Sequence, residues 1–136
     1  MIYLTRRERF SAAHRMFRPD WTDEENSRVF GKCANPNWHG HNYILFVTVK
    51  GEISSETGFV INMTILKTLI NEKVLSKLDH KNLNLDVDFM KGRIATTENL
   101  ATAIWNELYD PLKKEGAILH CIRIEETENN SVEYYG

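Results

Sequence analysis

The sequence predicts an α+β fold, in which an antiparallel four-stranded sheet carries two helices on one face. Three observations lead to this fold class. Segments with alternating apolar residues lie near both ends of the chain, two segments with helical periodicity lie between them, and no linker or repeat divides the 136 residues. A chain of this length builds one core but not two. We therefore expect residues 1–136 to form a single domain.

Two strands are expected in the first half of the chain. The first fourteen residues alternate loosely and place Leu4, Phe10, Ala12 and His14 on one face. Residues 41–50 alternate more regularly, with Tyr43, Leu45, Val47 and Val49 on one face. The intervening segments 18–26 and 31–40 are rich in charged residues, Gly, Asn and Pro, so we expect loops there.

Two helices follow a short strand predicted at residues 58–61. Asn62 is a good N-cap residue, and apolar residues then recur at helical spacing from Ile65 to Leu78. The second helix is expected to open near Thr96 or Thr97, and Pro111 is expected to end or kink it.

Gly116 breaks the chain before two final strands, predicted at residues 117–126 and 132–135. If both helices cover one face of an antiparallel sheet, the other face stays partly apolar and uncovered. We therefore expect the protein to form oligomers.

Composition excludes several classes of function. With 17 Lys+Arg against 19 Asp+Glu the net charge is −2, and no dense basic stripe suggests a nucleic-acid partner. No apolar run approaches the ~20 residues that span a bilayer. No secretory h-region follows Met1, and Cys33 and Cys121 form no CxxC motif. We expect a cytoplasmic protein with reduced thiols and no membrane or nucleic-acid partner.

His39-Gly40-His41 is the sharpest local motif. Residues i and i+2 of an extended chain point to the same side, so the two imidazoles can bind one ion. His14 ends another predicted strand and offers a third nitrogen. Three histidines around Zn²⁺ leave a fourth position open, as in catalytic sites. The alternative is a pair of ordinary loop histidines.

Further candidates lie elsewhere in the chain. Asp79 beside His80 can fix the tautomer of the imidazole, or the two can simply cap a helix end. Cys33, six residues before His39, can act as a base or nucleophile, or be a small buried residue. One of the neighbours Glu125 and Glu126 can accept hydrogen bonds from a planar ligand, or both can be solvated charge. Cys121 lies among apolar residues and is assigned to the core.

Five segments of the chain resemble the 6-pyruvoyltetrahydropterin synthase family, whose members have the tunnelling fold. They are FSAAHR at 10–15, FGKCANPNWHGHNY at 30–43, LDHKNL at 78–83, TTENL at 96–100 and ET at 126–127. The resemblance covers nearly the whole chain. Trp38 departs from it, since many members carry Gly there.

The resemblance implies a role for each candidate. It implies a catalytic zinc ion held by His14, His39 and His41. It makes Cys33 the proton-abstracting residue and gives it a relay formed by Asp79 and His80. It makes Glu126 the anchor of the pterin ring, with Thr96, Thr97 and Glu98 as neighbours of that ring.

The family's substrate is 7,8-dihydroneopterin triphosphate, and its products are 6-pyruvoyltetrahydropterin and triphosphate. Family members form trimers whose sheets close into a barrel, and two trimers stack as a hexamer with active sites between subunits. The resemblance therefore implies a homohexameric zinc lyase of tetrahydrobiopterin biosynthesis.

Three alternatives stay open. 6-Carboxytetrahydropterin synthase, of the queuosine pathway, uses the same substrate and releases acetaldehyde; its cysteine commonly lies four residues before the HxH motif, so the spacing here favours the pyruvoyl branch. A non-catalytic metal- or pterin-binding module would not need Cys33, Asp79, His80 and Glu126 together. A cysteine hydrolase would not need three clustered histidines.

Overall fold

The sheet has five strands in the order β3-β1-β2-β4-β5, and the computed structural model describes residues 1–136. The strands are β1 (Ile2–His14), β2 (His39–Gly51), β3 (Lys81–Asn82), β4 (Ile118–Thr127) and β5 (Asn130–Tyr134). All neighbours pair antiparallel except β3, which runs parallel to β1. The α+β class is confirmed, but the expected four-stranded antiparallel sheet is wrong. A two-residue strand carries no alternation that a sequence could reveal.

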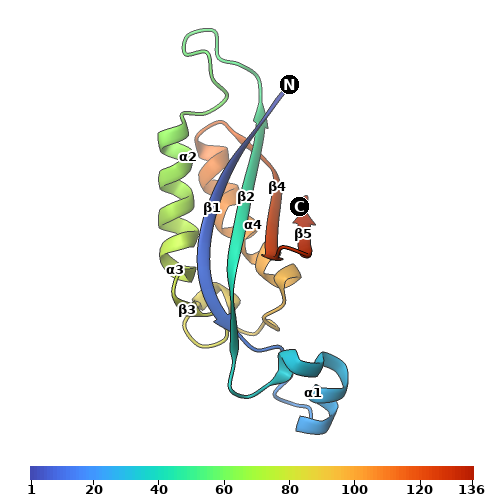
Figure 1. The fold of residues 1–136 in the computed structure, drawn as a ribbon. Coiled ribbons are helices and arrows are strands. Elements are labelled where there is room, and N and C mark those ends of the chain that lie inside the picture. The colour runs from blue at the N-terminus through green and yellow to red at the C-terminus, as the bar shows by residue number, and fades with distance from the viewer.

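β1 and β2 form the long central pair of the sheet and run side by side in Figure 1. They pair continuously from Ile2 opposite Gly51 to His14 opposite His39. Side chains on the helix-facing side, such as Tyr43 in β2, are fully buried. The predicted strand at 41–50 is thus confirmed, and β2 begins slightly earlier, at His39.

Two helical bodies pack on one face of this sheet (Figure 1). The first is continuous and comprises α2 (Met63–Ile70), a π-helical turn (Asn71–Leu75) and α3 (Ser76–Leu78). The second is α4 (Thr97–Lys114). The predicted N-cap is present, because Asn62 accepts from the Thr64 amide at 2.8 Å. The second helix begins where expected, and Thr96 caps it by accepting from the Asn99 amide at 3.2 Å.

One of the two outcomes expected at Pro111 does not occur, and the strand predicted at residues 58–61 is wrong. Pro111 does not end α4, which continues to Lys114, because Leu108 and Leu112 on either side of it are fully buried and offset the lost hydrogen bond. Residues 58–61 form bends rather than a strand. In that segment only Ile61 is buried in the core, and no neighbouring strand pairs with it.

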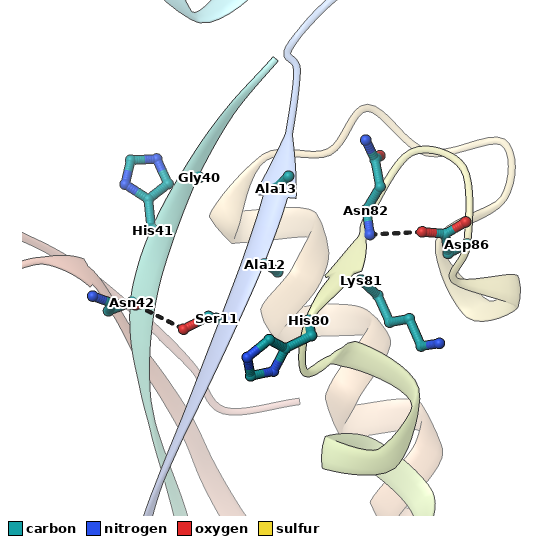
Figure 2. Close-up of a pocket in the computed structure, with 10 residues that line it drawn as sticks. All are labelled: Ser11, Ala12, Ala13, Gly40, His41, Asn42, His80, Lys81, Asn82 and Asp86. Atoms are coloured by element: carbon teal, nitrogen blue, oxygen red, sulfur yellow. Dashed lines mark hydrogen bonds between the residues drawn. The ribbon is translucent and has the colours of Figure 1, made fainter.

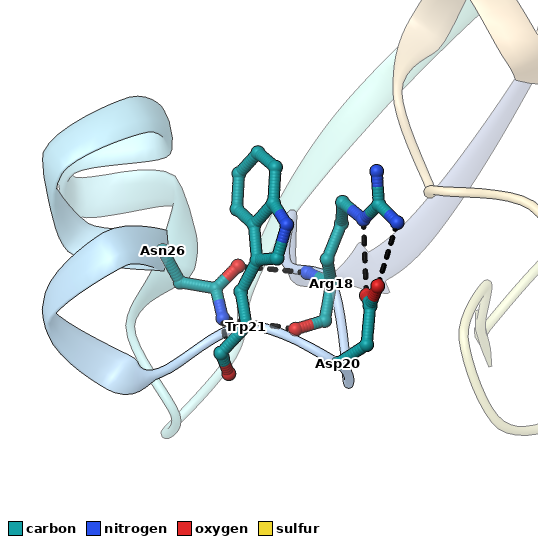
Figure 3. Close-up of polar contacts among 4 residues, drawn as sticks. All are labelled: Arg18, Asp20, Trp21 and Asn26. Carbon is teal, nitrogen blue, oxygen red and sulfur yellow. Dashed lines mark hydrogen bonds and ion pairs between the residues drawn. The ribbon is translucent and has the colours of Figure 1, made fainter.

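A third helix, α1 (Asp23–Phe30), replaces part of the loop predicted at 18–26. Thr22 caps it by accepting from the Glu25 amide at 3.1 Å. Asn26 is 2% exposed, and its side chain bonds both backbone groups of Arg18, as Figure 3 shows. Three acidic residues in its first turn favour the helix N-terminus. No helix in the chain is both long and apolar enough to span a membrane.

Candidate metal and substrate site

The register of the β1–β2 pair brings three histidines together. His14 lies directly opposite His39, and His41 follows on the same face of β2. The ring centroids are 4.4 Å apart for His14 and His39, and 5.1 Å for each of the other two pairs. One ligand atom from each residue lies within 4.8 Å of the others. The predicted cluster therefore forms within a single chain.

The hydrogen bonding of these rings suits a metal ion. Nδ1–H of His14 donates to the carbonyl oxygen of Ala95 at 2.7 Å, so the lone pair lies on Nε2. That Nε2 and the Nε2 of His41 are buried with no hydrogen-bond partner. Burial lowers the pKa of His14 and of His39, which favours the neutral form of both rings. Buried neutral nitrogens without partners are what zinc ligands require.

Glu126 lies beside the histidines, at the end of β4. Its Oε1 is 3.8 Å from Nε2 of His41, and the hydroxyl of Thr97 donates to its Oε2. Thr97 is the first residue of α4, so the start of that helix orients the carboxylate. The side chain of Thr96 caps the helix, so Thr96 helps to position Thr97 by fixing where α4 begins.

Cys33 shares a cavity of 340 Å³ with Thr97, Glu98 and Glu126. Cys33 comes from a 3₁₀ turn (Gly31–Ala34), and the other three come from α4 and β4. The carbonyl of Cys33 accepts from the Met16 amide at 2.8 Å, which ties the turn to the end of β1. The structure thus brings four of the candidate residues together from three separate parts of the chain.

Asp79 and His80 do not join this group. His80 lines a different cavity of 530 Å³, which Figure 2 shows between the strands β1 and β2 and the segment after α3. Its side chain is 83% exposed, and Asp79 Oδ2 lies 3.0 Å from its Nδ1. Within one chain, Cys33 and His80 therefore line separate cavities.

The backbone at His80 is held in an unusual conformation. Its φ is +61°, in the left-handed region, and its amide donates to the Ser11 carbonyl at 2.6 Å. Asp79 Oδ1 accepts from the Ser11 amide at 2.9 Å, and this bond is the main cause of the lowered pKa of Asp79. Both residues are thus hydrogen-bonded to β1, which fixes the position of the backbone from which the exposed imidazole of His80 projects.

Tyr43 is a site residue that sequence reasoning placed only in the core. Its hydroxyl is buried without a hydrogen-bond partner, and its ring stacks on Phe10 at 4.9 Å and lies 5.5 Å from His41. Burial raises the pKa of Tyr43, so its hydroxyl stays protonated. Tyr43 lies two residues after His41 on the same strand face, and this spacing is the sequence feature that indicates its place beside the histidines.

Trp38, which departs from the family pattern, adopts a φ of +65°. Glycine is favoured in that conformation, which accounts for the glycine found there in many family members. The indole lines a cavity of 460 Å³ together with Phe17 and Met90, and is not among the residues around Cys33 and Glu126.

Comparison with known proteins adds independent information. A family model described as 6-pyruvoyl tetrahydropterin synthase matches residues 3–136. The chain is 47% identical over 135 residues to 6-pyruvoyl tetrahydrobiopterin synthase of Dictyostelium discoideum, covering 99% of this chain and 96% of that protein. It is 46% identical over 133 residues to the Homo sapiens protein of the same name, covering 98% and 90%.

A solved structure gives the same picture. The structure of Caenorhabditis elegans 6-pyruvoyl tetrahydropterin synthase aligns with a TM-score of 0.93 at 38% identity, covering 99% of this chain and 95% of that chain. The similarity therefore extends over the whole fold, including the strands that hold the three histidines.

Proposed function

Because the chain belongs to the 6-pyruvoyl tetrahydropterin synthase family, we propose that it converts 7,8-dihydroneopterin triphosphate to 6-pyruvoyltetrahydropterin and triphosphate. One structural observation carries this proposal. Three clustered histidines, two of which have a buried nitrogen without a hydrogen-bond partner, lie next to a carboxylate that shares a cavity with a free thiol. Metal, ring anchor and base are the three functions that the reaction needs.

His14, His39 and His41 would hold the zinc ion. When bound, zinc would act as a Lewis acid on the oxygens of the substrate's side chain and acidify the adjacent C–H bonds. The bond from His14 to the Ala95 carbonyl keeps the first ligand ring in one orientation.

Glu126 would anchor the pterin ring. A carboxylate can accept two parallel hydrogen bonds from adjacent ring N–H and amino groups. The Thr97 hydroxyl fixes the plane of the carboxylate, and Glu98 lines the same cavity. Thr96 contributes by setting where α4 begins.

Cys33 would be the base, because a thiolate in that cavity can take protons from the side-chain carbons next to the ring. The Asp79–His80 pair would then act as the proton relay for the Cys33 of a second copy, since it is exposed and faces another cavity in its own chain. This arrangement supports sites shared between subunits. We propose that the subunits form a cytoplasmic homohexamer, built as two trimers whose sheets form barrels.

Two of the alternatives fit the structure less well. A cysteine hydrolase would need Cys33 and His80 in one site, and the two residues line different cavities. A non-catalytic binding module would not need a thiol beside the ring anchor. 6-Carboxytetrahydropterin synthase would use the same metal ligands, so only the product of the reaction distinguishes this alternative from the proposed function.

The direct test is incubation of the zinc-loaded protein with 7,8-dihydroneopterin triphosphate. We expect stoichiometric triphosphate and a pterin product with the mass of 6-pyruvoyltetrahydropterin. Chelation of the metal should abolish both, and re-addition of zinc should restore them. Absence of triphosphate release from the zinc-loaded protein would contradict the proposal.

A further inference from the structure

Two cationic side chains beside the candidate site have no anionic partner. Arg15 and Lys32 line a cavity of 610 Å³ together with Gly31 and Ala34 of the turn that carries Cys33. Neither forms an ion pair. One carboxylate, Asp23, also lines this cavity, so two cations face one anion and the cavity keeps an excess of positive charge.

Arg15 is held in place although nothing neutralises it. Its Nε donates to the Ala34 carbonyl at 2.7 Å, and its guanidinium carbon lies 4.1 Å from the centroid of the Phe17 ring. The side chain of Asn84 bonds both the amide and the carbonyl of Arg15. The contacts with Ala34 and Phe17 fix the guanidinium, those with Asn84 fix the backbone of Arg15, and the two terminal nitrogens stay available to a ligand. A planar, pre-positioned fork of this kind suits phosphate oxygens.

The two cations lie directly beside the proposed base. The Met16 amide donates to the Cys33 carbonyl, and Arg15 Nε donates to the next carbonyl, that of Ala34. The end of β1 therefore runs along the turn that carries Cys33. Lys32 precedes Cys33 in that turn. The cavity with Cys33 and Glu126 and the cavity with the two cations thus flank one short piece of backbone.

We propose that Arg15 and Lys32 form the subsite for the triphosphate group of the substrate. This inference rests on the proposed function. A substrate anchored by its ring at Glu126 and deprotonated at Cys33 would extend its phosphates past the turn toward these cations. In the elimination, Cys33 takes a proton from carbon, the C–H electron pair becomes the new C=C bond, and the C–O bond breaks. The C–O electron pair leaves on the triphosphate oxygen, next to the two cations.

Inorganic tripolyphosphate is the probe for this subsite, with binding to the zinc-loaded protein measured by calorimetry. Replacing Lys32, an exposed residue, by methionine (K32M) should weaken tripolyphosphate binding at least ~tenfold, because one charge-assisted contact is lost. R15K keeps the charge but loses the planar fork, and should also weaken binding. K67M is the matched control, since Lys67 is exposed on α2, and should bind as the unmodified protein does.

Binding of 7,8-dihydroneopterin, which has no phosphates, separates this inference from the proposed function. K32M and R15K should bind it as the unmodified protein does. Wild-type tripolyphosphate affinity in K32M would overturn the subsite. An equal loss of affinity for both ligands would also overturn it, because the residues would then support the whole site rather than the phosphates. If the proposed reaction itself fails, tripolyphosphate binding and its loss in K32M should still be measurable.

Discussion

Asn84 acts as a strand partner for Arg15. Its Oδ1 accepts from the Arg15 amide at 3.0 Å, and its Nδ2 donates to the Arg15 carbonyl at 2.8 Å. The regular pairing of β1 with β3 ends at Ala13 opposite Asn82. The side-chain amide of Asn84 therefore continues this pairing along β1, past the metal-ligand candidate His14, on the edge of β1 away from β2.

Replacing Asn84 by alanine should lower the free energy of unfolding of the metal-free protein by about 1–3 kcal/mol, since two part-buried backbone groups lose their partners. Chemical denaturation measures this change. N129A is the control, because Asn129 is exposed and its side chain makes no such bonds. Equal stabilities of the two variants would show that water replaces Asn84 without cost.

Replacing His39 by alanine should remove most of the zinc, because two nitrogens hold the ion far more weakly than three. Metal analysis after dialysis measures the zinc content per chain. H120A is the matched control, since His120 packs between the rings of Tyr3 and Tyr135, away from the cluster. Full zinc occupancy in H39A would refute the assignment of the ligands.

Replacing Cys33 by alanine should preserve zinc content and folding but reduce turnover by ~10²–10⁴-fold, the usual contribution of a general base. C121A removes the other free thiol, which is buried in β4, and should keep its activity. Near-normal turnover in C33A would move the role of base elsewhere, and His80 would be tested next.

Replacing Glu126 by glutamine should weaken substrate binding by ~1.5–3 kcal/mol and leave metal content unchanged. The amide accepts through one oxygen only, and its NH₂ group would face ring groups that are themselves donors. E125Q is the control, because Glu125 pairs with Arg123 at 2.8 Å. If E126Q binds substrate normally, Glu126 is ordinary surface charge.

The product should retain all three side-chain carbons. Cys33 lies six residues before His39, farther than the cysteine of the 6-carboxy branch, and no group in the site suggests stabilisation of a departing two-carbon fragment. Trapping of acetaldehyde as its hydrazone during turnover tests this. Stoichiometric acetaldehyde would place the protein in the 6-carboxy branch.

Periodic elements were predictable, and elements set by tertiary contacts were not. The long strands and the two large helices follow from apolar spacing alone. β3 has two residues and exists because the segment after α3 is tied to β1. α1 was hidden by a charged sequence, although Thr22 and the acids after it are helix-start signals.

The site was predictable to the extent that its residues are close in sequence. His39 and His41 share a strand face by spacing alone, and His14 required only that two strand ends be neighbours. The grouping of Cys33 with Glu126 depended on the family resemblance, because they come from distant parts of the chain. The Ala95 carbonyl gave no signal, since every residue type carries one.

Because His14 lies opposite His39, metal binding at this site depends on the alignment of β1 with β2 and can be used to follow that alignment during folding. A slip of one residue between β1 and β2 would turn one strand's side chains to the opposite face of the sheet and separate the nitrogens. The time course of metal binding in a refolding experiment therefore reports when β1 and β2 reach their native alignment. Zinc added early in refolding would bind only molecules in which β1 and β2 are correctly aligned. The ion should therefore stabilise the native strand alignment in addition to its role in the reaction.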